Sequence, residues 1–302
     1  MDAEAYFMKP VRLYLSITFL CLSAALPASS QAGVNFTEIS EMARFADAAY
    51  RSEAEIQATV EASDYKLVLY QTIAEIEVAF FLATNELTKT QLISIRGTSN
   101  IENTMVNISL KLTLNKDVGV SLHKGFAYSA KQIYAELKPF LLPEYKINVT
   151  GHSLGGAVAM ILAMYLETDQ FNVNQVVTFG QPKVTNLFGA DKFQQMNIIR
   201  VVAPDDLVPL VPLFDPLDIK NPDIYWHAGK EVILLDDTGY AILEGVDSML
   251  RATKFTQKPL SGENLNNHRM SAYLKLIDAR TRSAELVPYK IDFNLFNLFG
   301  GE

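Results

Sequence analysis

The chain has 302 residues, of which 49% are hydrophobic and 20% are charged, so it carries enough apolar material for one substantial core. Its formal net charge is −8, and it contains no long basic run. This charge pattern excludes the positive surface with which proteins bind phosphate backbones, so we expect no nucleic acid partner. Since no repeat or low-complexity linker divides the chain, we predict a single domain.

The N-terminal segment, 1–32, has the pattern of a secretory signal peptide. Two basic residues precede an uncharged run over 13–26, and small residues then lead to Ala32. We therefore expect cleavage after Ala32, a mature domain over 33–302, and a secreted protein. The alternative is an uncleaved membrane anchor, but 14 uncharged residues fall short of the ~20 that a helix needs to span hydrocarbon. The single cysteine, Cys21, would leave with the signal.

The start of the mature domain predicts two helices followed by three strands. Apolar residues recur at helical spacing over 38–51, and a charged helix-like stretch follows over 52–62. Runs rich in β-branched and aromatic residues then stand at 65–70, 76–84 and 91–95, the last two separated by a polar turn.

Strand-like runs alternate with helical stretches in the remainder. An amphipathic pattern predicts a helix over 129–141, and strands are predicted at 146–150, 175–179, 198–203 and 230–235. Such alternation is typical of a mainly parallel sheet with helices on both faces, so we predict an α/β fold. Ligands of these folds bind at the C-terminal edge of the strands.

The strand at 146–150 continues into a catalytic motif, Gly-His-Ser-Leu-Gly at 151–155, and then into an apolar helical run. A strand–turn–helix of this kind holds the serine in a strained conformation, and its two glycines avoid collisions with the neighbouring elements. We therefore predict that Ser153 is a nucleophile presented at the edge of the sheet.

A serine nucleophile needs a base, and the base needs a carboxylate that orients it. In hydrolases built on this turn, the acid and then the histidine follow the serine along the chain. The strand at 198–203 runs into a loop with Asp205 and Asp206, either of which could be the acid. We predict that His268 is the base because it follows the last strand, whereas His227 precedes that strand and should lie at the opposite edge.

Ester cleavage also needs hydrogen-bond donors for the oxyanion. The backbone N–H of Leu154 follows the nucleophile at the start of a helix, where the dipole favours negative charge. A second donor is expected from the loop after 91–95, which points to Thr98. The sequence shows no metal-ligand spacing, phosphate loop or dinucleotide fingerprint, so we expect neither a metal nor a cofactor.

Together these motifs resemble the class 3, or fungal-type, lipases of the α/β-hydrolase fold. The resemblance implies that Asp206 is the triad acid, that Thr98 and Leu154 form the oxyanion hole, and that His227 stands outside the triad. The matching motifs follow in order at 43–50, 96–98, 101–103, 123–126, 151–156, 178–183, 206–209, 227–231 and His268.

The resemblance further implies a lid over 99–108. Ile101, Met105 and Ile108 share one helical face, which suits a lid that covers an acyl groove and then meets a lipid interface. The alternative is an ordinary surface helix that packs this face on the core. The chain has Thr104 where some fungal members place a tryptophan, which does not favour strong interfacial activation.

The resulting expectation is a secreted serine ester hydrolase, a lipase that cleaves acylglycerols through an acyl-enzyme intermediate. Alternatives are a phospholipase, a short-chain esterase, or a catalytically silent binding protein with a hydrolase fold. The expected partner is a lipid or ester substrate, with transient contact to a lipid interface. The sequence does not determine the oligomeric state, for which a monomer is the expectation.

Overall fold

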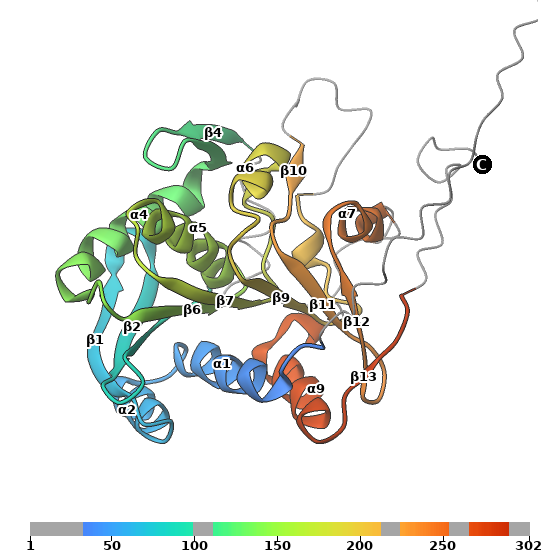
Figure 1. Cartoon of the computed structure of the whole chain (residues 1–302), viewed down its shortest axis with the longest axis horizontal. Helices are drawn as coiled ribbons and strands as arrows, with labels where there is room; N and C mark the ends of the chain where they lie inside the picture. Colours follow the sequence, from blue (N-terminus) through green and yellow to red (C-terminus); the bar gives the residue numbers. More distant parts are fainter. Residues whose placement is uncertain (1–32, 99–110, 213–223, 254–265, 290–302) are drawn as a thin grey trace, which may run out of the picture. The chain divides into compact units, whose positions relative to one another are not determined.

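A nine-stranded sheet forms the centre of the protein (Figure 1). The computed structural model describes residues 33–98, 111–212, 224–253 and 266–289, and the elements all lie in the unit Asn35–Glu302. In spatial order the strands are β1 (Lys66–Ile73), β2 (Val78–Asn85), β3 (Thr90–Ile95), β6 (Lys146–His152), β7 (Val173–Phe179), β9 (Ile198–Val202), β11 (Lys230–Leu234), β12 (Gly239–Leu243) and β13 (Glu285–Leu286).

The central strands, from β3 to β11, pair in parallel with one another, and antiparallel pairs extend the sheet at both sides. Every residue of β2 and β3 is buried. The predicted mainly parallel sheet is therefore confirmed, and each predicted strand is present with ends shifted by a few residues. Strands β12 and β13 were not predicted.

A second sheet of four short strands was also not predicted. Its strands, in spatial order, are β10 (Tyr225–Trp226), β8 (Thr185–Asn186), β5 (Val120–His123) and β4 (Leu112–Asn115). Two to four residues are too few to establish an alternating pattern, so nothing in the sequence signals these strands.

Helices cover both faces of the large sheet (Figure 1). Helices α4 and α5 lie on one face, whereas α1 and α9 pack together on the other. The α-helices are α1 (Phe36–Ala48), α2 (Glu53–Glu61), α4 (Lys124–Leu137), α5 (Leu154–Thr168), α6 (Leu187–Lys192), α7 (Gly245–Thr253) and α9 (Met270–Arg282), and short 3-10 turns occur at Ala74–Ile76, Lys138–Phe140 and Val208–Leu210.

Local sequence explains where α1 begins and why α5 is buried. The side chain of Asn35 accepts hydrogen bonds from the N–H groups of Thr37 and Glu38, which caps α1. Helix α5 is buried on all sides along most of its length, because its residues are almost entirely apolar. No helix within the described ranges combines the length and the apolar character needed to cross a bilayer.

This topology collects the predicted site residues at one edge. Thr98 follows β3, Ser153 follows β6 and Asp206 follows β9, and these three strands run parallel within the same sheet. Their C-terminal ends therefore meet at a common edge.

Candidate active site

Ser153 occupies a sharp turn between β6 and α5. Its backbone angles are φ 58° and ψ −130°, a conformation that costs a non-glycine residue about 1–3 kcal/mol. The turn is held by a hydrogen bond from Ser153 N to Phe179 O, at 2.8 Å. The strained turn predicted from the motif is thus present, at a residue that is only 1% exposed.

The two glycines of the motif allow the start of α5 to approach the sheet. A Cβ at Gly151 would lie 2.5 Å from Gly155 O, and one at Gly155 would lie 2.2 Å from Ile95 O. Any side chain at either position would collide with main-chain atoms, so the turn requires glycine there.

Asp206 and His268 form a buried pair. His268 Nδ1 lies 2.7 Å from Asp206 Oδ2, and both side chains are at most 3% exposed. Since a carboxylate only accepts hydrogen bonds, Nδ1 carries the proton, and the lone pair of the neutral ring is at Nε2. Asp205, the other candidate acid, is exposed.

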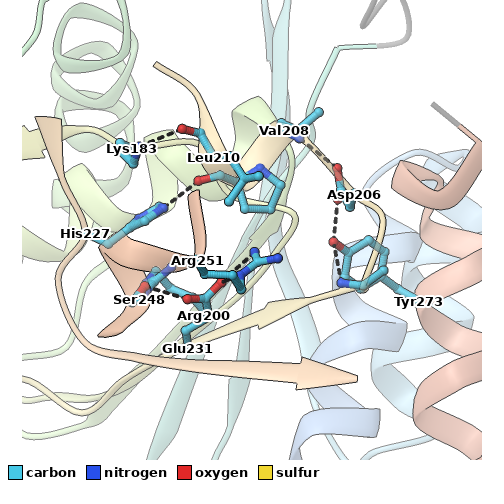
Figure 2. Close-up of polar contacts among 12 residues, drawn as sticks. Lys183, Arg200, Asp206, Val208, Leu210, His227, Glu231, Ser248, Arg251 and Tyr273 are labelled. Carbon is cyan, nitrogen blue, oxygen red and sulfur yellow. Dashed lines mark hydrogen bonds and ion pairs between the residues drawn. The ribbon is translucent and has the colours of Figure 1, made fainter. Parts of the chain in front are cut away.

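Two further donors fix the Asp206 carboxylate (Figure 2). Val208 N donates to Oδ1 at 2.9 Å, and the Tyr273 hydroxyl donates to Oδ2 at 2.5 Å. Burial and the nearby Asp206 charge raise the pKa of Tyr273 well above its usual value, so the phenol keeps the proton that it donates. Tyr273 was not singled out in the sequence, because nothing local distinguishes it from other aromatic residues on a helix.

His268, the predicted base, lies beside the turn that carries Ser153. The rings of His152 and His268 are 4.6 Å apart between centroids, and His152 Nε2 lies 2.7 Å from His268 O. A Cβ at Gly180, next in the chain to the Phe179 that binds Ser153 N, would lie 2.7 Å from His268 Cε1. Ser153 Oγ and His268 Nε2 are both buried, and neither makes a hydrogen bond within the described part of the chain.

The candidate oxyanion donors flank the same turn. Leu154 is the first residue of α5, and Thr98 stands just after Gly97, whose Cβ position would lie 3.1 Å from Ser153 Cβ. Gly97 N donates to the Tyr50 hydroxyl at 3.1 Å. The structure therefore brings the loop with Thr98 against the turn.

Two sequence predictions concern residues outside the described ranges, and a third concerns His227. The lid residues Ile101, Met105 and Ile108, and the signal segment 1–32, lie outside the described residues. His227 Nε2 donates to Pro209 O at 2.6 Å, a bond that involves neither Asp206 nor His268.

A cluster of buried charges, drawn below the segment that follows Asp206 in Figure 2, lies near the candidate site. Glu231 accepts hydrogen bonds from Arg251 Nε at 2.8 Å and from Ser248 Oγ at 2.5 Å, and Arg200 also donates to Ser248 at 3.0 Å. Burial tends to raise the pKa of Glu231, but Arg251 and Arg200 outweigh it, so the pKa is lowered and the carboxylate stays charged.

Two further buried side chains, Lys183 and His227, bind the main chain of the loop that follows Asp206. Lys183 Nζ donates to Leu210 O at 2.6 Å and to Pro212 O at 2.9 Å, and His227 binds Pro209 O. Burial lowers the pKa of Lys183 to about 7, because the charged form is costly in this environment. These main-chain bonds fix the segment that follows Asp206.

We expect the buried histidines His152 and His227 to make the folded protein less stable in acid. Burial, with a smaller effect of His268, lowers the pKa of His152 to about 3 from its usual 6.5. Between these values the unfolded chain binds a proton that the folded chain does not, so stability falls as pH falls from about 6.5 to 3, by roughly 1.4 kcal/mol per pH unit. His227, whose pKa burial also lowers, acts with the same sign.

Urea unfolding of wild type and His152→Gln between pH 7.5 and 4.5 measures this contribution. Glutamine does not titrate, so the free energy of unfolding of the variant should fall less steeply with acid than that of wild type. If the free energy of unfolding fell equally with pH in the two proteins, His152 would not be held neutral by the fold.

Comparisons with known proteins agree with this architecture. Residues 92–215 match the model of the Lipase (class 3) family. The secreted mono- and diacylglycerol lipase 1 of Fusarium solani is 34% identical over 177 residues, which is 55% of this chain and 51% of that protein. The chain spans about half the length of the curated relatives that it matches first.

Solved structures show the same fold. The lipase of Rhizopus microsporus var. chinensis superposes with a TM-score of 0.58 and 25% identity, over 67% of this chain and 75% of that one. A triacylglycerol lipase described as having a serine protease triad at its catalytic centre superposes with a TM-score of 0.55 and 26% identity, over 67% of this chain and 80% of that one. The α/β-hydrolase fold and the resemblance to class 3 lipases are thereby confirmed.

Proposed function

We propose that this chain, a class 3 lipase relative with an α/β-hydrolase fold, hydrolyses acylglycerol esters through a covalent acyl-enzyme intermediate. The observation that carries the proposal is the buried Asp206–His268 pair beside a serine held at positive φ. A carboxylate, a correctly protonated imidazole and a strained serine at one sheet edge are the parts that nucleophilic ester cleavage requires.

In this mechanism Ser153 Oγ attacks the ester carbonyl while His268 Nε2 takes the serine proton. The imidazolium is stabilised by Asp206, and it then protonates the departing alcohol as the tetrahedral intermediate collapses to the acyl-enzyme. Water then hydrolyses the acyl-enzyme. His268 takes a proton from the water as its oxygen attacks the acyl carbon, and the proton passes to Ser153 Oγ as the fatty acid leaves.

Two donors from different segments are proposed to bind the negative oxygen of each tetrahedral intermediate. Leu154 N–H at the start of α5 supplies one, and Thr98 after β3 supplies the other. Each donor of this kind contributes about 3 kcal/mol to lowering the barrier.

Acylglycerols are the proposed substrates because the matched relatives include a mono- and diacylglycerol lipase and a triacylglycerol lipase. The relative from Fusarium solani is a secreted protein. With the signal pattern over 1–32, this supports an extracellular site of action, and cleavage after Ala32 is the proposal that the signal pattern makes.

Hydrolysis of p-nitrophenyl esters from short to long acyl chains, each measured across its solubility limit, tests the proposal. We expect turnover of long-chain as well as short-chain esters. Saturable activity on short soluble esters alone would show that the protein is an esterase and not a lipase. Absence of turnover on every ester, together with no labelling by a serine-reactive phosphonate, would contradict an enzymatic function.

A further inference from the structure

A chain of hydrogen bonds runs beneath the candidate site and uses two side chains that the triad does not. Gly97 N lies 3.1 Å from the Tyr50 hydroxyl, the hydroxyl lies 2.8 Å from His152 Nδ1, and His152 Nε2 lies 2.7 Å from His268 O. The chain therefore joins the end of α1, the loop after β3, the turn that carries Ser153 and the segment that carries His268.

The direction of each bond follows from the chemistry of the groups. The main-chain oxygen of His268 can only accept, so His152 Nε2 must carry a proton. His152 is 6% exposed and its pKa is lowered to about 3, so the ring is neutral and Nδ1 is an acceptor. The Tyr50 hydroxyl then donates to Nδ1, and its oxygen accepts from Gly97 N–H.

Burial also keeps Tyr50 in its donor form. The pKa of the phenol is raised above its usual value, chiefly because burial penalises the phenolate. The approach to Gly97 is close: a Cβ there would lie only 2.5 Å from the Tyr50 hydroxyl oxygen. The contact thus depends on glycine immediately before Thr98.

Resting on the ester-hydrolase function proposed above, we infer that Tyr50 and His152 are positioning residues of the active site. Their hydrogen-bonded chain from Gly97 N–H to His268 O sets the oxyanion loop and the base at fixed places relative to Ser153. Neither side chain touches the reacting atoms in this role. Tyr50 acts through the main chain of Gly97, which adjoins Thr98, and His152 acts through the main chain of His268.

The chain has a direct consequence for catalysis because its two ends act at the same moment. His268 must receive the serine proton while the donor beside Gly97 meets the developing oxyanion. A shift of about 1 Å in either group can reduce the rate by about 100-fold. A chain of hydrogen bonds between the two therefore couples the position of the base to that of the oxyanion loop.

Steady-state kinetics of four variants on a soluble short-chain ester tests the inference. Tyr50→Phe and His152→Phe keep an aromatic ring but break the chain, and we expect kcat to fall about 10- to 100-fold with little change in KM. His152→Gln can still donate to His268 O and accept from Tyr50, so it should retain most of the wild-type kcat. Tyr165→Phe is the matched control, since it loses a bond to Asn115 at 2.7 Å on α5 and should keep wild-type kinetics.

The double variant Tyr50→Phe/His152→Phe distinguishes one chain from two separate effects. Because both changes break the same chain, the double variant should be about as slow as the slower single variant, whereas independent effects multiply. Thermal unfolding of each variant checks that the loss of kcat exceeds what a lower folded fraction would produce.

The outcomes are separable. If wild type is active, two results would overturn the positioning role alone. One is wild-type kcat in both Tyr50→Phe and His152→Phe, and the other is a double variant in which the two losses of kcat multiply. Equal losses in His152→Gln and His152→Phe would do the same, because the role depends on the hydrogen bonds. Wild type without activity on any ester contradicts the proposed function, and this inference with it.

Discussion

Replacement of Ser153 by alanine is expected to lower kcat by about 10⁵- to 10⁶-fold, the scale of loss when a serine nucleophile is removed from an intact triad. The alcohol that would form the acyl-enzyme is gone, and Asp206 and His268 have no alternative nucleophile at the turn. Labelling by a serine-reactive phosphonate should be lost in parallel.

The same substitution should leave the fold intact. Ser153 Oγ makes no hydrogen bond within the described residues, so alanine forfeits no partner there. Urea unfolding should place the variant within about 0.5 kcal/mol of wild type. Ser129→Ala, a change of the same kind on α4, is the control for activity, and retained hydrolysis by Ser153→Ala would reject Ser153 as the nucleophile.

Asp206→Asn is expected to produce the second largest loss, about 10⁴-fold in kcat. Three donors converge on this carboxylate: His268 Nδ1, the Tyr273 hydroxyl and Val208 N. An asparagine has only one acceptor oxygen, so its amide N–H₂ must face at least one donor whichever way the group is turned. His268 would be released from its tautomer or its position.

Kinetics and unfolding of Asp206→Asn and Asp205→Asn test this prediction together. The Asp206 variant should also lose about 1–3 kcal/mol of stability, because buried donors are left without an acceptor. Asp205 is exposed, and the same change there should keep nearly the wild-type rate. Comparable losses in the two variants would contradict the assignment of Asp206 as the acid.

The sequence predicted the parts of the fold that local patterns encode. The parallel strands from β3 to β11 are long enough to show apolar runs, and the turn at Ser153 requires glycines at fixed spacing. The residues alone left Asp205 and Asp206 open as the acid, and the family resemblance favoured Asp206. The structure brings Asp206 to His268, while the catalytic roles of both remain predictions.

What the sequence did not reveal depends on contacts between distant segments. Tyr50 and His152 are 102 positions apart, and Tyr273 is 67 positions from Asp206. No periodicity or spacing connects such pairs, since the sheet topology alone places them together. The strands of the small sheet were missed for a different reason, because they are too short to carry a pattern.

The packing of α1 against α9 across the lower face of the sheet (Figure 1) has a consequence for the time at which activity begins. The turn at Ser153 is built from β6, α5 and the end of β7, whereas His268 comes with the segment that leads into α9 and Tyr273 lies within α9. A growing chain that has not yet made α9 therefore has the segments of the serine turn but lacks His268, the proposed proton acceptor. Under the proposed mechanism, hydrolysis requires His268 and can therefore begin only after this segment has docked, without any separate inhibitor.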